Sequence, residues 1–233
     1  MEVIYGFNPV EEALKAQKRK FFEILVARES HNNIASLAKG ISLSTVTRTE
    51  LDRITGVKNH QGIAARVSPF RYAALEDAAA LDFAVLLDSV EDPQNLGSII
   101  RTAYALAGAA VIIPEDRAAP VTPAVVKASA GATEKAVVAR VVNLRHAIKE
   151  LKKNGFWLIG LDAKAKDSIQ TTPDFKNIAI VMGGEDSGIR PVIAGELDFL
   201  AHIPMRGPFN SLNVSQSAAI AVYELAVRRN QTR

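Results

Sequence analysis

The sequence predicts an α/β protein in which a small amino-terminal domain precedes a larger domain built on a parallel sheet. From residue 81 onward, short apolar runs alternate with helical patterns, as is typical of a parallel sheet with helices on both faces. The runs are nearly continuous Val, Ile, Leu and Ala, as burial of both faces requires. Three of them end in loops rich in Gly, Pro, Asn and Ser, and such sheets bind ligands at the carboxyl ends of their strands.

Composition limits the classes of protein that need to be considered. The 233 residues can form one large domain or two modest ones with a sizeable core, and 48% hydrophobic residues exclude a disordered chain. The absence of cysteine excludes a disulfide framework and a thiolate metal site, and we expect no metal. The opening residues lack the basic segment and apolar core of a secretory signal. No apolar run is long enough to span a bilayer, so we expect a cytoplasmic protein without membrane contact.

The net charge of +3 is unevenly distributed. Residues 1–72 contain 11 Lys and Arg against 7 Asp and Glu, whereas residues 73–233 contain 17 against 18. A basic amino-terminal part beside a near-neutral remainder indicates an anionic partner such as nucleic acid. The alternative is a solvated surface with a small excess of lysine.

The domain boundary is expected in the polar, Ala-rich residues 71–80, which we interpret as a linker between domains at 1–70 and 81–233. In the first domain, Pro9 lies near the first turn of a helix and Gly40 follows another. The predicted strands there are 21–27, 44–48 and 62–67, and the predicted helices are 9–17, 33–40 and 50–55. In the second domain, the predicted strands are 83–89, 109–114, 136–141, 156–162, 177–183 and 199–205, and the predicted helices are 98–108, 123–131, 144–155 and 214–229.

The first motif, DSVEDPQNLGSIIRTA, begins at Asp88. Its Pro and Gly set a turn, and the pattern predicts that a helix begins near Ser98, capped by Asn95 or Ser98 itself. Arg101 would then lie in the first turn, where a cation opposes the helix dipole. Because helix amino ends attract anions, an Arg at this position suits a phosphate ligand. The alternative is an ordinary surface Arg.

The second motif, VMGGEDSGIRP, runs from Val181 into a glycine-rich loop. Gly183 and Gly184 permit close approach of a ligand to the backbone, although a plain tight turn has the same composition. The order G-G-x-x-x-G does not match the dinucleotide fingerprint G-x-G-x-x-G, which argues against a nucleotide-dependent enzyme of ordinary doubly wound topology. Glu185 can either orient a hydroxyl or amide in a site or accept backbone N–H bonds.

The third motif, IPMRGPFNSLNVSQSAA, begins at Ile203, where a strand is expected to end. Ser211 or Asn213 lies near the start of the following helix, so either can be a simple N-cap. None of the four histidines lies in the three motifs; His202 precedes the third and is expected within the strand.

Together the three motifs resemble those of the SpoU (TrmH-type) RNA ribose 2′-O-methyltransferases of the SPOUT superfamily, and the resemblance covers essentially the whole chain. It implies a parallel sheet with a carboxy-terminal deep trefoil knot, although general topology rules argue against knots. It also implies an L30e-like RNA-binding domain at the amino terminus, a homodimer, and S-adenosylmethionine as the cofactor.

By position, the resemblance places the catalytic Arg on Arg101 and the cofactor contacts on Gly183, Ile203 and Leu212. The supporting polar residues of the catalytic set would be Asn95, Glu185, Ser211 and Asn213. For the RNA we expect contacts from Lys58 and His60 in the loop 58–61 and from Arg101. The resemblance also implies that this Arg acts as the base, but the pKa of arginine lies so far above neutral pH that neutralising one at pH 7 costs about 8 kcal/mol. We therefore expect Arg101 to bind phosphate and hold the 2′-hydroxyl.

The opening residues and residues 58–67 resemble the RlmB-like branch, which methylates a guanosine ribose in 23S ribosomal RNA. Three alternatives remain: a transfer-RNA ribose methyltransferase, an antibiotic-resistance enzyme that acts on ribosomal RNA, and a non-catalytic RNA-binding protein of the same fold.

Overall fold

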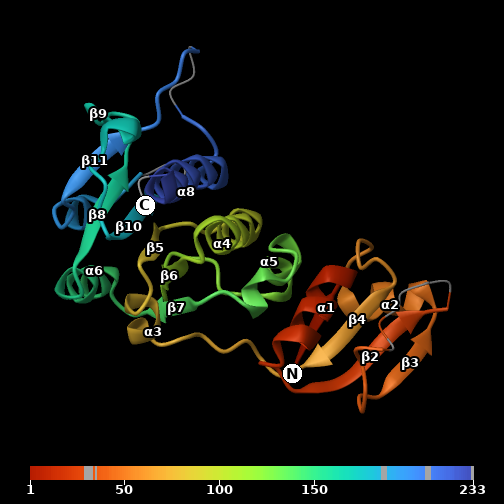
Figure 1. Ribbon diagram of the computed structural model, residues 1–233. Coiled ribbons are helices and arrows are strands. Elements are labelled where there is room, and N and C mark those ends of the chain that lie inside the picture. Colours follow the sequence, from red (N-terminus) through yellow and green to blue (C-terminus); the bar gives the residue numbers. More distant parts are fainter. Residues whose placement is uncertain (29–33, 35, 185–187, 208–210, 232–233) are drawn as a thin grey trace. The chain divides into compact units, whose positions relative to one another are not determined.

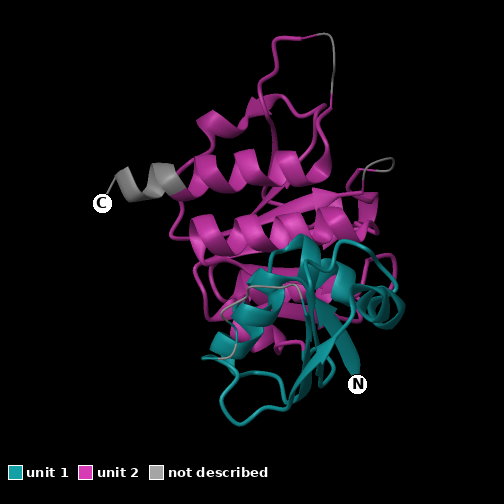
Figure 2. Ribbon diagram, turned by 90° about the vertical axis from the view of Figure 1, so that its right-hand side faces the viewer, with its two compact units in different colours: residues 1–71, 121–135 teal, residues 72–120, 136–233 magenta. Residues whose placement is uncertain are grey.

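The computed structural model of the chain describes residues 1–28, 34, 36–184, 188–207 and 211–231, which form two compact units (Figures 1 and 2). Unit 1 comprises Met1–Arg71 and Val121–Lys135, and unit 2 comprises Tyr72–Pro120 and Ala136–Arg233. Unit 1 thus contains a segment from the middle of the chain in addition to the residues expected for the amino-terminal domain.

Unit 1 is built on a four-stranded mixed sheet in the order β1-β4-β2-β3. Its strands are β1 (Glu2–Tyr5), β2 (Phe21–Ala27), β3 (Leu43–Val46) and β4 (Ile63–Val67). Strand β4 pairs antiparallel with β1 and β2, whereas β2 and β3 are parallel. Strand β2 has the predicted bounds. Strand β1 was not predicted, because its four residues are too few to establish a period.

The helices of unit 1 are α1 (Phe7–Ala16), α2 (Arg48–Thr55), α5 (Pro123–Ala128) and the 3₁₀ helix η1 (Ala132–Glu134). Helix α2 begins with a capping box, in which Thr47 and Glu50 satisfy each other's backbone N–H groups. The helix predicted at 33–40 is wrong in its described part, because Ile34 and residues 36–40 contain turns and no helix; residues 33 and 35 lie outside the described residues.

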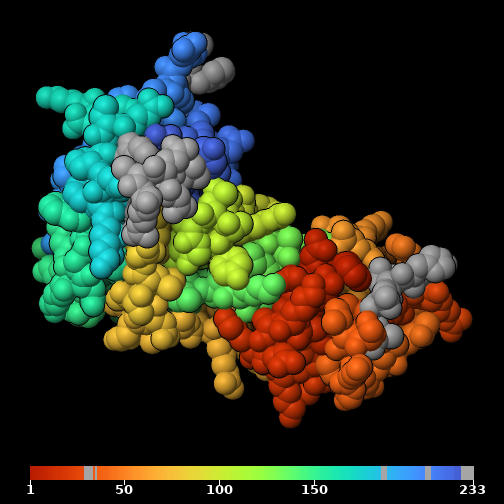
Figure 3. Space-filling view, viewed as in Figure 1, coloured from red at the N-terminus to blue at the C-terminus, as the bar shows by residue number. Residues whose placement is uncertain are grey.

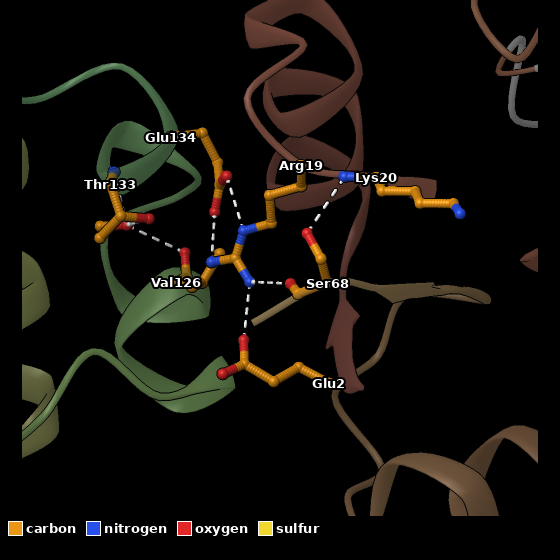
Figure 4. Close-up of polar contacts among 8 residues, drawn as sticks. Glu2, Arg19, Lys20, Ser68, Val126, Thr133 and Glu134 are labelled. Atoms are coloured by element: carbon orange, nitrogen blue, oxygen red, sulfur yellow. Dashed lines mark hydrogen bonds and ion pairs between the residues drawn. The ribbon is translucent and has the colours of Figure 1, made fainter. Parts of the chain in front are cut away.

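A buried ion pair ties the segment 121–135 to the amino-terminal residues of unit 1 (Figure 4). Arg19 Nε and Nη2 donate to the two carboxylate oxygens of Glu134 at 2.9 and 2.8 Å, and Nη1 donates to Glu2 at 2.7 Å. The side chains of Arg19 and Glu134 are 2% and 1% exposed. Burial raises the pKa of Glu134, and the guanidinium of Arg19 opposes this effect. Arg19 is therefore a structural residue of unit 1, although the sequence places it between two exposed lysines.

Breaking this pair from one side should destabilise the protein, because it leaves a buried charge without its partner. We expect Arg19→Met to lower the free energy of unfolding by about 3–5 kcal/mol, and the double variant Arg19→Met/Glu134→Leu to recover most of that loss. Denaturant titration of both variants, with the exposed Lys20→Met as the matched control, measures the effect. A loss below about 1 kcal/mol for Arg19→Met would contradict this account.

Unit 2 contains a seven-stranded sheet in the order β7-β6-β5-β10-β8-β11-β9, in which every neighbouring pair is parallel. The strands are β5 (Phe83–Asp88), β6 (Ala110–Pro114), β7 (Val138–Val141), β8 (Phe156–Leu161), β9 (Asp167–Ser168), β10 (Asn177–Gly183) and β11 (Phe199–His202). The predicted parallel α/β sheet is confirmed. Strand β9 was not predicted, since two residues carry no pattern, and β11 ends before the residues Ile203–Met205 that were expected to finish it.

The helices of unit 2 are α3 (Leu75–Ala79), α4 (Pro93–Ala107), α6 (Leu144–Lys153), α7 (Pro191–Ala194) and α8 (Val214–Gln231). Apolar side chains of α3, α6 and α7 pack on the sheet in one buried cluster, and α4 and α8 pack against each other (Figure 1). Helix α3 lies in the residues expected to be a linker. No helix in the described part of the chain has both the length and the apolar character needed to cross a bilayer.

Helix α4 begins five residues earlier than predicted. Asp92 is its N-cap, accepting the backbone N–H of Gln94 at 3.0 Å, and Pro93 occupies the first helical position. Asn95 and Ser98 therefore lie inside the helix and do not cap it. Arg101 falls in the third turn, so the expected opposition between its charge and the helix dipole is wrong.

Candidate functional site

The three motif loops leave the sheet at the same edge. They follow strands β5, β10 and β11, and the register pairs Gly183 at the end of β10 with Asp88 at the end of β5. A cavity of about 740 Å³ lies there, a size typical of small-molecule sites. The residues around it come from the end of β8 and the loop after it, from the end of β11, and from the second and third motifs: Leu161, Asp162, Ala163, Lys164, Met182, Gly183, Gly184, Gly188, Ile189, Ala201, His202, Ile203, Met205, Ser211, Leu212, Asn213, Val214 and Ser217.

The first and second loops are joined by an ion pair that the sequence analysis missed. Asp88 is fully buried. Its Oδ1 accepts a hydrogen bond from Arg190 Nε at 2.7 Å and lies 2.6 Å from Arg190 Nη2 in an ion pair. Its Oδ2 accepts the backbone N–H of Arg190 at 2.9 Å. The signal for this pair was present, because Asp88 is the single charged residue of an otherwise apolar buried strand, and buried charges are paired.

Gly183 occupies a position that no other residue can fill. A Cβ atom there would collide with the carbonyl group of Gly188, to which the chain returns after the loop. Gly188 has a left-handed backbone with φ of 63°, and its N–H donates to Gly184 O at 3.0 Å. The cavity is therefore lined here by backbone groups rather than by side chains. Glu185, expected in the catalytic set, lies outside the described residues.

Asn213 joins the third loop to the first. Its Oδ1 accepts the backbone N–H of Ser215 at 2.8 Å, which caps helix α8, while its Nδ2 donates to Asn95 Oδ1 at 3.0 Å. Asn95 is buried, at 7% exposure. The capping interpretation is therefore correct for Asn213 but incomplete, since the same side chain also connects two motifs.

The remaining expected site residues of unit 2 separate into two groups. Ile203, Ser211 and Leu212 line the cavity together with Gly183 and Asn213. Arg101 is exposed on α4, does not line the cavity, and makes no hydrogen bond or ion pair within the described ranges. The cation is thus available to an external anion.

In unit 1, the loop 58–61 contains Lys58 and His60, the two residues of this unit that were expected to contact RNA. Lys58 is exposed, whereas His60 is only 1% exposed. His60 Nδ1 accepts the backbone N–H of Gly62 at 2.9 Å, and Nε2 lies 3.0 Å from Asp52 Oδ1. The buried hydrogen bonds of His60 therefore stabilise the conformation of the loop, whereas the side chain of Lys58 faces solvent.

Among the described residues, no group of three or more His, Cys, Asp or Glu side chains is arranged to hold a metal ion.

Comparison with known proteins gives consistent matches over the length of the chain. The model of the SpoU rRNA Methylase family matches residues 82–223, and the model described as RNA 2′-O ribose methyltransferase substrate binding matches residues 3–73. YacO of Bacillus subtilis (strain 168), assigned to the TrmH family of tRNA/rRNA methyltransferases, is 38% identical over 243 residues, covering 98% of this chain and 96% of YacO.

Solved structures share the fold. The SpoU methyltransferase AviRb from Streptomyces viridochromogenes, in complex with AdoMet, has a TM-score of 0.85 at 22% identity and covers 98% of this chain and 90% of its own. The AdoMet-bound rRNA methyltransferase from Sinorhizobium meliloti has a TM-score of 0.83 at 25% identity, with coverage of 97% and 87%. These findings define an RNA 2′-O-ribose methyltransferase with S-adenosylmethionine as its cofactor. The chain belongs to the SpoU rRNA methylase family.

The two functions of the Asn213 side chain can be separated by one substitution. Asp caps helices as well as Asn does, so Asn213→Asp should change the free energy of unfolding by less than about 1 kcal/mol. The substitution removes the Nδ2 donor to Asn95, which connects the third loop to the first. We expect the rate of methyl transfer to fall roughly 10- to 100-fold, because a small displacement of the loops misaligns the reacting groups. Denaturant titration and a methyl-transfer assay check both expectations, and Asn213→Ala, which loses both bonds, is the comparison. Full activity in Asn213→Asp would show that the link to Asn95 is dispensable.

Proposed function

We propose that this enzyme methylates the ribose 2′-hydroxyl of a guanosine in 23S ribosomal RNA, with its cofactor in the cavity at the carboxyl ends of β8, β10 and β11. The observation that carries the proposal is the convergence of the second and third motifs on one cavity, with the first motif bonded to both. The match of residues 3–73 to an RNA substrate-binding model supports an RNA substrate held partly by unit 1.

The cavity fits S-adenosylmethionine in size and in lining. The backbone of Gly183 and Gly184 forms one wall, and Ile203 and Leu212 add apolar side chains, which suits the planar, uncharged adenine of the cofactor. When bound, the cofactor supplies a methyl group activated by a sulfonium centre. The protein's task is then to align the hydroxyl with that methyl group, and such alignment can contribute about 7–11 kcal/mol.

Arg101 is the residue proposed to hold the RNA at the reacting ribose. Its guanidinium is a planar fork that matches a phosphate in a bidentate manner, which lysine cannot reproduce. Glu185, Asn95, Ser211 and Asn213 are proposed to complete the catalytic set by orienting the hydroxyl and the loops around it.

Substitution of Arg101 should therefore affect catalysis and not cofactor binding. We expect Arg101→Ala and Arg101→Lys to lower kcat about a hundredfold or more. Affinity for S-adenosylmethionine should remain within about twofold, because Arg101 does not line the cavity. Methyl-transfer kinetics and calorimetry measure the two quantities, with the exposed Lys149→Ala on α6 as the control. Near-normal turnover in Arg101→Lys would rule out the bidentate role.

We also propose that the carboxy-terminal chain is knotted. The topology supports this: β10 lies between the earlier strands β5 and β8, and the final helix α8 returns to pack on α4 and β10. A trefoil knot additionally requires that the carboxy-terminal segment pass through a loop formed by an earlier part of the chain.

A homodimer formed through α4 and α8 is proposed on the basis of exposed apolar side chains. Tyr104 and Leu106 on α4 are 37% and 40% exposed, and Ile220 and Tyr223 on α8 are 40% and 56% exposed. Figure 3 shows α4, in yellow-green, as part of the molecular surface. Large exposed apolar residues on two packed helices are typical of an association surface.

A charge placed on this surface should prevent association. We expect Tyr223→Lys to convert a dimer into a monomer and to lower methyl transfer, if each site is completed by the partner chain. Sedimentation velocity measures the oligomeric state, and Val142→Lys, at the 81% exposed Val142 after β7, is the matched control. A monomeric wild-type protein, or a dimeric Tyr223→Lys variant, would contradict the proposal.

The substrate is tested by mapping ribose methylation in RNA. We expect one guanosine of 23S ribosomal RNA to lose its 2′-O-methyl group in cells that lack this protein, and to regain it on complementation with the wild type but not with Arg101→Ala. Loss of a ribose methyl group in transfer RNA instead would support the transfer-RNA alternative, and binding of RNA without any methylation would support the non-catalytic one.

A further inference from the structure

One wall of the cavity comes from a loop outside all three motifs. Asp162, Ala163 and Lys164 follow strand β8 and line the cavity. Among the described lining residues, Lys164 is the one lysine or arginine and Asp162 is the one carboxylate. The charged side chains of the described cavity wall are therefore both on this loop, and the rest of that wall is apolar or uncharged.

The position of Lys164 is set by backbone hydrogen bonds around Asp162. Asp162 N donates to Ala201 O on β11 at 3.1 Å, which ties the loop to the sheet. Lys164 N donates to Asp162 Oδ1 at 2.8 Å, and Ala165 N donates to Asp162 O at 3.0 Å. Because Asp162 uses its side chain to hold the turn, it positions the lysine. The Lys164 ammonium has no hydrogen bond or ion pair within the part of the chain that the structure describes.

A second observation indicates that this wall faces polar ligand atoms. His202, the last residue of β11, lines the same cavity, and its buried Nδ1 has no hydrogen-bond partner among the described residues. Buried polar atoms are nearly always hydrogen-bonded, so an unpaired one beside a cavity points to a partner supplied by a ligand.

The chemistry of the cofactor identifies the group that Lys164 can bind. S-adenosylmethionine has a neutral adenosine, a cationic sulfonium, a cationic ammonium and a single anionic group, its carboxylate. We propose that Lys164 binds this carboxylate and thereby orients the methionyl part of the cofactor, with Asp162 as its positioning residue. This inference rests on the proposed placement of the cofactor in the cavity.

The test compares ligands that differ in the carboxylate. Calorimetry on the full-length protein measures the affinities for S-adenosylmethionine, S-adenosylhomocysteine and 5′-methylthioadenosine, which lacks the amino-acid group. We expect Lys164→Met to weaken the first two about tenfold and to leave 5′-methylthioadenosine within twofold, as loss of one charge-assisted hydrogen bond implies. Lys164→Arg should restore binding. Lys166→Met, two residues along and outside the cavity lining, should change none of the three.

Three outcomes would overturn the proposal. The first is an equal loss of affinity for all three ligands, and the second is unchanged binding of all three. The third is unchanged cofactor binding with weaker RNA binding, which would assign Lys164 to an RNA phosphate. Gly183→Val reports separately on the placement of the cofactor, because its side chain would collide with Gly188 at the cavity wall. If that variant binds all three ligands as the wild type does, the cavity assignment itself fails.

Discussion

The buried carboxylate of Asp88 is the constraint on which the site depends. A charge at the end of a fully apolar strand has to be compensated, and the compensating group is Arg190, 102 residues later in the chain. Its guanidinium and its backbone N–H satisfy both carboxylate oxygens, so the residues that follow β10 are held against the end of β5. The amide pair Asn95–Asn213 then connects the third loop to the same place.

These polar links are needed because the sheet alone does not define the loops. Parallel strands align their carboxyl ends, but glycine-rich segments beyond those ends have many accessible conformations. Each link between loops removes part of that freedom before a ligand arrives, so less ordering has to occur on binding. The close backbone contact between Gly183 and Gly188 has the same effect on these two residues, because neither can move without a collision.

The sequence predicted what local periodicity encodes and missed what depends on distant partners. The parallel sheet followed from apolar runs, and the three loops followed from their composition. The predicted start of α4 was wrong because Gly97 and Ser98 resemble a turn followed by a cap. Asp92 followed by Pro93 is the stronger signal for the start of a helix. The buried role of Arg19 was not predicted, because its partner Glu134 lies 115 positions away. Arg190 was missed as the partner of Asp88 for the same reason, because the two residues lie 102 positions apart, and the loop at Lys164 was missed because it belongs to none of the three motifs.

Because it includes the segment 121–135, unit 1 consists of two separate stretches of the sequence. The polypeptide passes from one unit to the other three times, and η1 contributes Glu134 to the buried pair with Arg19. Removal of residues 1–72 would therefore leave the Glu134 carboxylate without Arg19, and helix α5 without its contacts to β1 and α1. Unit 1 therefore cannot be exchanged between homologous enzymes as residues 1–71 alone: a functional chimera must also contain residues 121–135, because otherwise the buried carboxylate of Glu134 has no partner.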